Sequence, residues 1–187
     1  MSQQEKPWPW PAPAKDGAAR HLISGTQLPD VALEASLGAP VNLARRAGQS
    51  ILFIYPFTGT PGQPNPPDWD TIPGAHGSTP EAEGFRDNYL ALEDLGFEIF
   101  GLSGQSSADQ QAFATRLELP FPLLSDANFT FANGLCLPRF ETGGKTYLKR
   151  ITFIIRNGVI EDTIFPVHPP DRHAGDLLVR LCDSQYE

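Results

Sequence analysis

Apolar positions along this chain switch between the spacing of strands and the spacing of helices. Residues 50–55 (SILFIY) are continuously apolar after the first serine and rich in β-prone types, which is typical of a strand buried on both faces. This run predicts the centre of a sheet. Residues 78–95 then place Phe85, Tyr89 and Leu92 at helical spacing, and Gly96 is expected to end that helix.

The alternation continues to the end of the chain. After a Gly143-Gly144 turn, residues 148–155 and 159–167 read as strands, and Asn157-Gly158 between them favours a tight hairpin turn. A last helix is expected from about Asp171. The other expected elements are strands at 98–102 and 122–124, helices at 108–117 and 129–135, and a hairpin within 28–43. Together they predict an α/β fold with a mixed β-sheet flanked by helices on both faces.

Two proline-rich segments interrupt this order. Residues 5–16 (EKPWPWPAPAKD) are expected to form an extended arm, so we divide the chain into an arm, 1–21, and a domain, 22–187. Tryptophans in a solvated arm would expose much apolar area, so Trp8 and Trp10 either pack on the domain or on a neighbouring subunit, or belong to a disordered tail. The four prolines of 63–76 predict an irregular, functional loop.

Composition narrows the function classes. With 187 residues, 40% of them apolar and 19% charged, the chain suits one soluble globular domain. A net charge of -8 opposes binding to nucleic acid and to anionic lipid, and no apolar run approaches the roughly 18 residues of a membrane span. Cys136 and Cys182 are too few for a disulfide framework and lack metal-ligand spacing. We expect a cytoplasmic protein without a metal or other cofactor.

One pair of segments resembles a known motif. Residues 55–62 (YPFTGTPG) and 77–87 (GSTPEAEGFRD) resemble the pattern YPxxxTPGCTxEACxFRD of the Q subfamily of peroxiredoxins, with 63–76 as an insertion inside it. The resemblance continues through 121–126 and 150–155 and covers about residues 28–181. It implies a thioredoxin-like fold, a peroxide as small-molecule substrate, a thioredoxin-type reductant where a thiol is present, and a possible homodimer.

The resemblance also assigns candidate site residues. Ser78 stands at the position of the peroxidatic cysteine, and Glu83 at that of the resolving cysteine. Arg150 corresponds to the active-site arginine and Thr60 to the active-site threonine, although the insertion makes the threonine's alignment ambiguous. The residues expected to contact substrate are Pro56, Trp69, His76 and Thr79.

Serine at position 78 changes the expected chemistry. A peroxiredoxin needs a thiolate whose pKa is lowered by a helix N-terminus and an arginine, and the sulfur becomes a sulfenic acid. Serine has a weakly acidic hydroxyl and no comparable oxidation. The chain as written is therefore predicted not to be a thiol peroxidase. The helix N-terminus and Arg150 would remain as a site for a small anionic or oxygenated ligand.

Structural roles compete with these assignments. Ser78 and Glu81 have the spacing of a capping box, which alone would explain the serine. Arg150 could serve as a strand-end salt bridge, although a charge at the head of a buried strand needs some partner. Glu83 stabilises the helix dipole more readily than it acts as a general base. A nucleophilic triad of Ser78 and His76 with an acid is disfavoured, because residues two apart seldom converge.

The remaining reactive side chains also have simpler explanations. Cys136 is either a displaced redox thiol or a buried small hydrophobe, and Cys182 is expected to pack within the last helix. His168 and His173 lack a third ligand at metal spacing, so surface or capping roles are expected for both.

Three functional hypotheses remain. In the first, serine has replaced the cysteine of a one-cysteine peroxidase that needs an external thiol. In the second, Ser78 is natural and the scaffold serves non-redox catalysis or binding of a small molecule at Arg150. In the third, the chain is a module for subunit interaction.

Overall fold

The structure is a computed structural model that describes residues 7–184. Residues 1–6 of the predicted arm and residues 185–187 of the predicted domain lie outside the described residues. No helix within 7–184 has both the length and the apolar character needed to cross a membrane.

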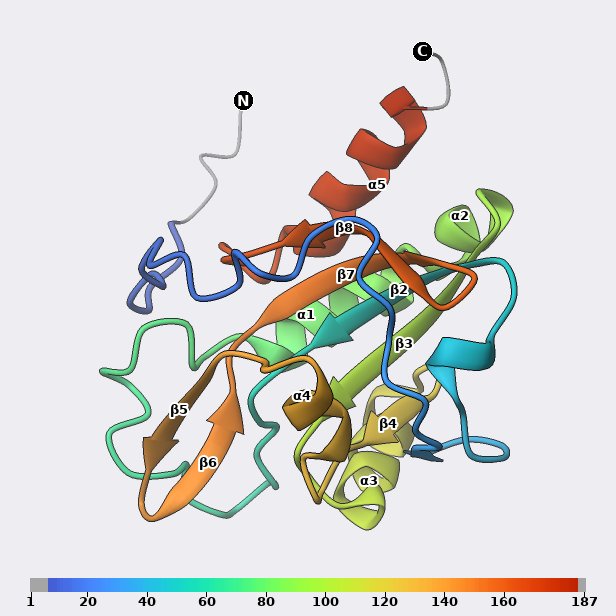
Figure 1. Ribbon diagram of the computed structural model, residues 1–187. Helices are drawn as coiled ribbons and strands as arrows, with labels where there is room; N and C mark the ends of the chain where they lie inside the picture. Colours follow the sequence, from blue (N-terminus) through green and yellow to red (C-terminus); the bar gives the residue numbers. More distant parts are fainter. Residues whose placement is uncertain (1–6, 185–187) are drawn as a thin grey trace.

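A six-stranded mixed sheet forms the centre of the fold (Figure 1). Its strands, in spatial order, are β1 (Glu34–Ala35), β4 (Leu123–Ser125), β3 (Phe97–Ser103), β2 (Gln49–Ile54), β7 (Ile151–Arg156) and β8 (Val159–Ile164). The pairs β2–β3 and β3–β4 are parallel, and the other three pairs are antiparallel. The run 50–55 therefore lies in the middle of the sheet, as its continuous apolar character predicts.

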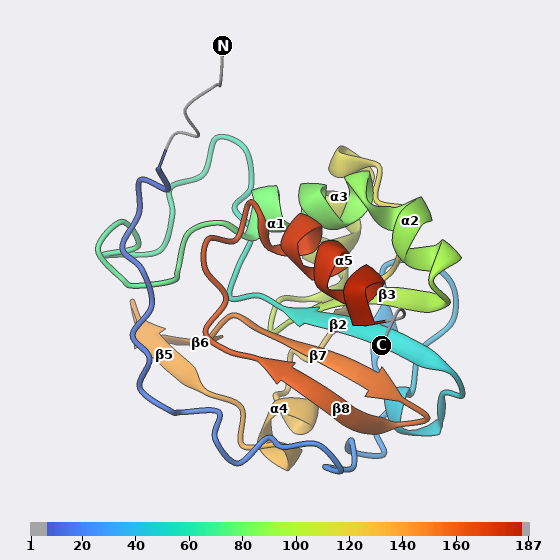
Figure 2. The ribbon, with the colours of Figure 1, turned by 90° about the horizontal axis from the view of Figure 1, so that it is seen from above.

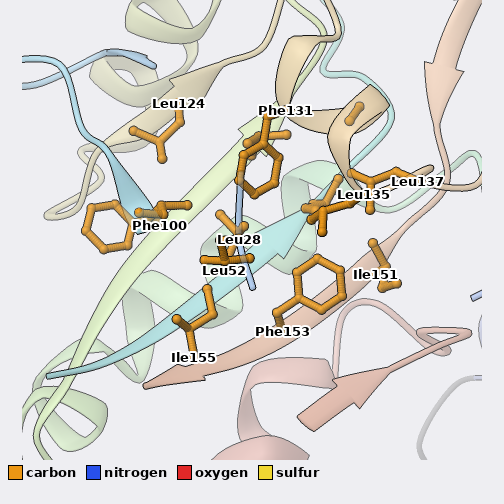
Figure 3. Packing of buried hydrophobic residues seen from close by; sticks show 14 of the residues in the cluster. Leu28, Leu52, Phe100, Leu124, Phe131, Leu135, Leu137, Ile151, Phe153 and Ile155 are labelled. Atoms are coloured by element: carbon orange, nitrogen blue, oxygen red, sulfur yellow. The ribbon is translucent and has the colours of Figure 1, made fainter. Parts of the chain in front are cut away.

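Helices cover both faces of the sheet (Figure 2). One face carries α1 (Ser78–Asp87), α2 (Tyr89–Asp94), α3 (Ser107–Leu117) and α5 (His173–Ser184), and the other carries α4 (Thr130–Gly134). The side chains of β2 alternate between the two cores: Ile51 and Phe53 face α1, whereas Leu52 faces α4. Phe131 of α4 packs with Leu28 from the N-terminal coil in the second core (Figure 3). The predicted α/β, thioredoxin-like architecture is confirmed.

The predicted hairpin within 28–43 is reduced to one antiparallel bridge, in which Leu33 and Val41 exchange two backbone hydrogen bonds of 2.9 Å. The short 3-10 helix Leu43–Arg45 follows it. β1 pairs instead with β4, with Glu34 opposite Ser125. The outer edge of β4 would otherwise lack a hydrogen-bonding partner, and alternation within 28–43 carries no information about which edge its strand will join.

The predicted strand 148–155 is two strands. A separate hairpin, β5 (Arg139–Thr142) and β6 (Lys145–Leu148), turns at Gly143-Gly144. The chain leaves β6 after Leu148 and enters β7 at Ile151, so Arg150 lies at the junction. The apolar pattern conceals this break because both flanking segments are buried.

The predicted helix 78–95 is interrupted at Asn88. The Asn88 side-chain amide donates to the carbonyl of Gly84 at 2.8 Å, which competes with regular helical bonding and divides α1 from α2. The chain turns at Gly96 with a φ of 88°, as expected. Asn157 and Gly158 both have positive φ, as the predicted tight turn requires.

An aromatic stack fixes α1 against the sheet. The ring of Phe53 on β2 stacks on Phe85 of α1 with 4.4 Å between centroids. Gly101 on β3 leaves the space for this arrangement, because a Cβ there would lie 2.5 Å from Leu123 Cδ2 and 2.8 Å from Phe53 Cζ. Packing at Gly101 therefore helps to hold α1 against the sheet.

We expect Gly101→Ala to lower the free energy of unfolding by about 1–3 kcal/mol, because the added methyl overpacks the sheet beneath α1. Urea unfolding followed by circular dichroism measures this change. Gly175→Ala is the control: that α5 position has nothing within 4 Å of an added Cβ, so alanine there should be neutral or stabilising. Equal effects of the two substitutions would contradict the close packing at Gly101.

Candidate functional site

Ser78 is the first residue of α1, and its side chain is buried. The residue before it, Gly77, is the N-cap with a φ of 115°, and its carbonyl accepts from the Glu81 N–H at 3.0 Å. A Cβ on Gly77 would lie 2.1 Å from Pro170 Cγ, so glycine is required. The predicted capping box between Ser78 and Glu81 is therefore wrong. Both side chains turn instead toward Arg150.

Arg150 connects three segments at this end of α1. One guanidinium nitrogen, Nη1, forms an ion pair with the Glu81 carboxylate. The other, Nη2, donates to Ser78 Oγ at 3.2 Å and to the carbonyls of Ala75 and His76 at 3.3 and 3.2 Å. The prediction that Arg150 needs a partner is confirmed. The two roles considered for Arg150, a site residue and a partner in a salt bridge, are compatible, because the same guanidinium contacts both Ser78 and Glu81.

Glu81 is a site residue that the sequence analysis assigned only to capping. Its side chain is 0% exposed, and burial raises the pKa of the Glu81 carboxyl to about 7 against the opposing effect of Arg150. Among the described residues, Glu81 Oε1 and Arg150 Nε have no hydrogen-bond partner. The signal that could have identified Glu81 is its place three residues after Ser78, on the same side of the first helical turn.

His173 lies beside the pair, in the core. Its Nε2 is 2.8 Å from Thr152 Oγ1, and its ring meets Phe85 edge-on. Burial, with a smaller effect of Arg150, lowers the pKa of His173 to about 4. The predicted surface or capping role is therefore wrong for His173, because the first turn of α5 packs against α1. His168 is exposed, as expected.

A cavity of about 230 Å³ opens in front of Ser78. Thr58, Asn65 and Thr79 contribute polar groups to its lining. Five aromatic residues also line this cavity, which is open to solvent and exposes more polar than apolar surface: Trp8, Trp10, Phe57, Trp69 and His76. Of the predicted site residues, the fold thus brings Ser78, Trp69, His76 and Thr79 to one cavity.

The tryptophan arm packs on its own domain. Trp10 stacks on the imidazole of His76 with 3.7 Å between centroids and 10° between planes. The backbone N–H of Gly74 donates to the carbonyl of Pro11 at 3.0 Å. The alternative of a disordered tail is therefore wrong for the described part of the arm, which lies beside the inserted loop (Figure 1).

Four predicted residues do not line this cavity. Arg150 lies behind Ser78 and lines another cavity. Thr60 is exposed, and the neighbouring threonine, Thr58, takes the place at the cavity. The backbone N–H and the hydroxyl of Thr58 both donate to Gln105 Oε1, at 2.8 and 3.1 Å. Pro56 lines an adjacent cavity, and Glu83 is half-buried on α1 away from Ser78. The insertion 63–76 shifted the motif, so spacing alone could not choose between the threonines.

Neither cysteine lies at the cavity. Cys136 follows α4 in a left-handed conformation, with a φ of 49°, and its thiol is exposed. The interpretation of Cys136 as a buried hydrophobe is therefore wrong, because the chain reverses there toward the surface. Cys182 is half-buried on α5. Within residues 7–184, no group of three or more His, Cys, Asp or Glu side chains is placed to hold a metal ion.

We expect Glu81→Ala to lower the free energy of unfolding by about 3–5 kcal/mol, because it leaves the Arg150 charge buried without a counter-ion. Urea unfolding at pH 8 measures the change. Glu161→Ala is the matched control, since its pair with Arg156 is solvent-exposed and should contribute less than about 1 kcal/mol. A similar small cost at both positions would contradict the importance of the buried pair.

The buried imidazole of His173 should make the free energy of unfolding depend on pH. Below pH 6.5 the unfolded chain protonates this imidazole, whereas the folded chain keeps it neutral down to about pH 4, so stability falls as pH falls through that window. Between pH 7 and pH 5, the free energy of unfolding should therefore fall by about 2 kcal/mol less in His173→Gln than in the unmodified chain. Urea unfolding at the two pH values tests this, and identical losses would contradict it.

Comparison with known proteins gives one consistent family. The AhpC/TSA family model matches residues 72–163. Peroxiredoxin Q of Arabidopsis thaliana is 30% identical over 174 residues, covering 89% of this chain and 73% of that protein. Peroxiredoxin Q of Sedum lineare is 29% identical over 169 residues, covering 89% and 82%.

Solved structures agree with the sequence comparison. Peroxidoxin BcpB from Mycobacterium tuberculosis is 29% identical with a TM-score of 0.69, covering 87% of this chain and 98% of that one. A cysteine-to-serine mutant of Xylella fastidiosa PrxQ is 22% identical with a TM-score of 0.71, covering 89% and 99%. The second likeness supports the fold.

Proposed function

The chain belongs to the peroxiredoxin family, with relatives of the Q and bcp type, and on that premise we propose that its Ser78 cavity binds a small peroxide-like or anionic oxygenated molecule without reducing it. The observation that carries this proposal is the hydrogen bond from Arg150 to Ser78 Oγ at the start of α1. A hydroxyl occupies the position that would need a redox-active sulfur, while the groups around it still suit oxygen-rich ligands.

The donors at this position favour an oxyanion. The amides of Ser78 and Thr79 belong to the first turn of α1, where no preceding turn accepts from them. Ser78 Oγ adds a hydroxyl that lines the cavity. These groups would hold an oxygen atom at the positive end of the helix dipole.

The buried ion pair adds a charge that depends on pH. Because burial raises the pKa of Glu81 to about 7, protonation of its carboxyl below that pH leaves the Arg150 charge without compensation. The pair then carries a net positive charge directly behind Ser78. This charge favours an anionic ligand over a neutral one.

A second candidate is a one-cysteine peroxidase in which serine occupies the reactive position. The contact between Arg150 and Ser78 Oγ supports it, because a sulfur at this site would lie beside the guanidinium and at the helix N-terminus. Such an enzyme would use a peroxide and an external thioredoxin-type thiol. Position 83 would supply no resolving sulfur, since it is Glu83.

Ser78→Cys tests what both candidates share: a cavity that positions a peroxide, and a chain that does not reduce it while residue 78 is serine. The unmodified chain should consume no hydrogen peroxide above background with dithiothreitol or thioredoxin, because it has no thiol at the cavity. Ser78→Cys should consume it at least about 100-fold faster, since Arg150 and α1 would lower the pKa of the new thiol. Peroxide disappearance measures both rates.

Ser78→Ala is the control for folding and background. Cys136→Ala with Cys182→Ala, added to Ser78→Cys, excludes the other thiols. Peroxidase activity in the unmodified chain would overturn the claim that it does not reduce its ligand. An inactive, folded Ser78→Cys variant would show that the cavity does not position a peroxide.

A further inference from the structure

We propose that Trp8 and Trp10 are specificity-determining residues of the Ser78 cavity and select a ligand with a flat aromatic body and one oxyanion or hydroperoxide end. This inference rests on the proposed function, because it assumes that the cavity takes an oxygen-bearing molecule. It adds a prediction for the part of that molecule that carries no oxygen. The arm would then be a wall of the binding site, contributed by a segment outside the sheet and its helices.

Three contacts hold the arm in place. The carbonyl of Pro11 accepts from the Gly74 N–H, and a Cβ on Gly74 would lie only 3.2 Å from Pro13 Cβ. At the end of the arm, Asp16 pairs with Lys149 at 2.8 Å. These contacts join the arm to the inserted loop and to the β6–β7 junction. The contacts of Pro11, Pro13 and Asp16 therefore fix the position of the two tryptophans that precede them.

Each tryptophan is placed against a residue next to Ser78. Trp10 stacks on His76, whose Nε2 is 2.7 Å from Asp70 Oδ1. Trp8 lies over the N-cap of α1, where a Cβ on Gly77 would come within 3.0 Å of Trp8 Cζ2. Both rings line the same cavity as Ser78 Oγ. The aromatic surface thus begins directly beside the predicted oxyanion position.

The size and lining of the cavity indicate the ligand's body. A closed cavity of ~150 Å³ lined by apolar side chains holds benzene, and this one, which is open to solvent and also lined by polar groups, has about 230 Å³. Hydrogen peroxide would leave most of that volume unfilled. Phe57 and Trp69 add two further rings, packed edge to face at 5.6 Å. A benzene ring with a short oxygen-bearing substituent fits the volume and gains stacking contacts with the lining.

The polar groups indicate how such a ligand would lie. Ser78 Oγ and the first amides of α1 would receive its oxygen, while the ring would lie toward Trp8 and Trp10. Arylalkyl hydroperoxides and benzoate-like carboxylates share this chemistry. An aliphatic analogue of equal polarity would keep the contact at Ser78 and lose the stacking.

The test uses Ser78→Cys as a reporter of bound peroxide. In this variant the thiolate attacks the terminal oxygen, the O–O bond breaks, and the alcohol leaves after taking a proton. Dithiothreitol then reduces the sulfenic acid to the thiol with release of water. We would measure kcat/KM for cumene hydroperoxide, tert-butyl hydroperoxide and hydrogen peroxide.

Adding Trp8→Ala or Trp10→Ala to the reporter should lower the ratio of kcat/KM for cumene hydroperoxide to that for hydrogen peroxide by about tenfold, because stacking is lost. The ratio for tert-butyl hydroperoxide should change less. Pro9→Ala is the matched control, since Pro9 is exposed between the two tryptophans and does not line the cavity. That variant should leave all three values unchanged. If both tryptophan variants keep the ratio, the inference is overturned while the proposed function stands.

A second measurement avoids cysteine chemistry. Titration calorimetry with benzoate and cyclohexanecarboxylate on the unmodified chain should show tighter binding of benzoate, and both tryptophan variants should remove that preference. If the reporter reduces no peroxide, the proposed function fails, and this titration still decides the role of the arm. Absence of benzoate binding, or a preference that survives both substitutions, would overturn the inference.

Discussion

Arg150 and Glu81 form an ion pair from which water is almost wholly excluded. Two buried charges are stable only if each compensates the other, so the pair ties the β6–β7 junction to the first turn of α1. The same guanidinium holds the carbonyls of Ala75 and His76, which end the inserted loop, and the hydroxyl of Ser78. The β6–β7 junction, the inserted loop and the first turn of α1 therefore meet at the Arg150 guanidinium. Their positions around it determine the geometry of the cavity.

Two segments outside the sheet and its helices supply most of the aromatic residues that line the cavity. The inserted loop brings Trp69 into the core and leaves His76 beside Ser78. The proline-rich arm then lays Trp10 on His76. Aromatic rings from both segments thereby lie beside the start of α1. Within residues 7–184, no cysteine lines this cavity, and the proposed ligand is one that would contact both Ser78 and these rings.

Much of the fold could be predicted because local pattern and tertiary environment agree. The continuously apolar strand 50–55, the Asn157-Gly158 turn and the end of α2 at Gly96 each depend on neighbouring residues and backbone conformation. The hairpin within 28–43 forms only one bridge, and its strand β1 pairs with β4, because alternation shows that a strand has two faces and does not show which edge it joins. Position 78 was located by its motif, whereas Thr58 was missed because the insertion disrupts the spacing.

By itself, the sequence determined the main strands and helices of the sheet, the family, and the absence of cysteine at position 78. These properties are encoded in short runs of neighbouring residues. Only the tertiary structure decided that Glu81 pairs with Arg150, that His173 is buried, and that Trp10 lies on His76. Such contacts join residues distant along the chain, and they form because burial of charged and aromatic groups requires a partner that only the folded chain brings close.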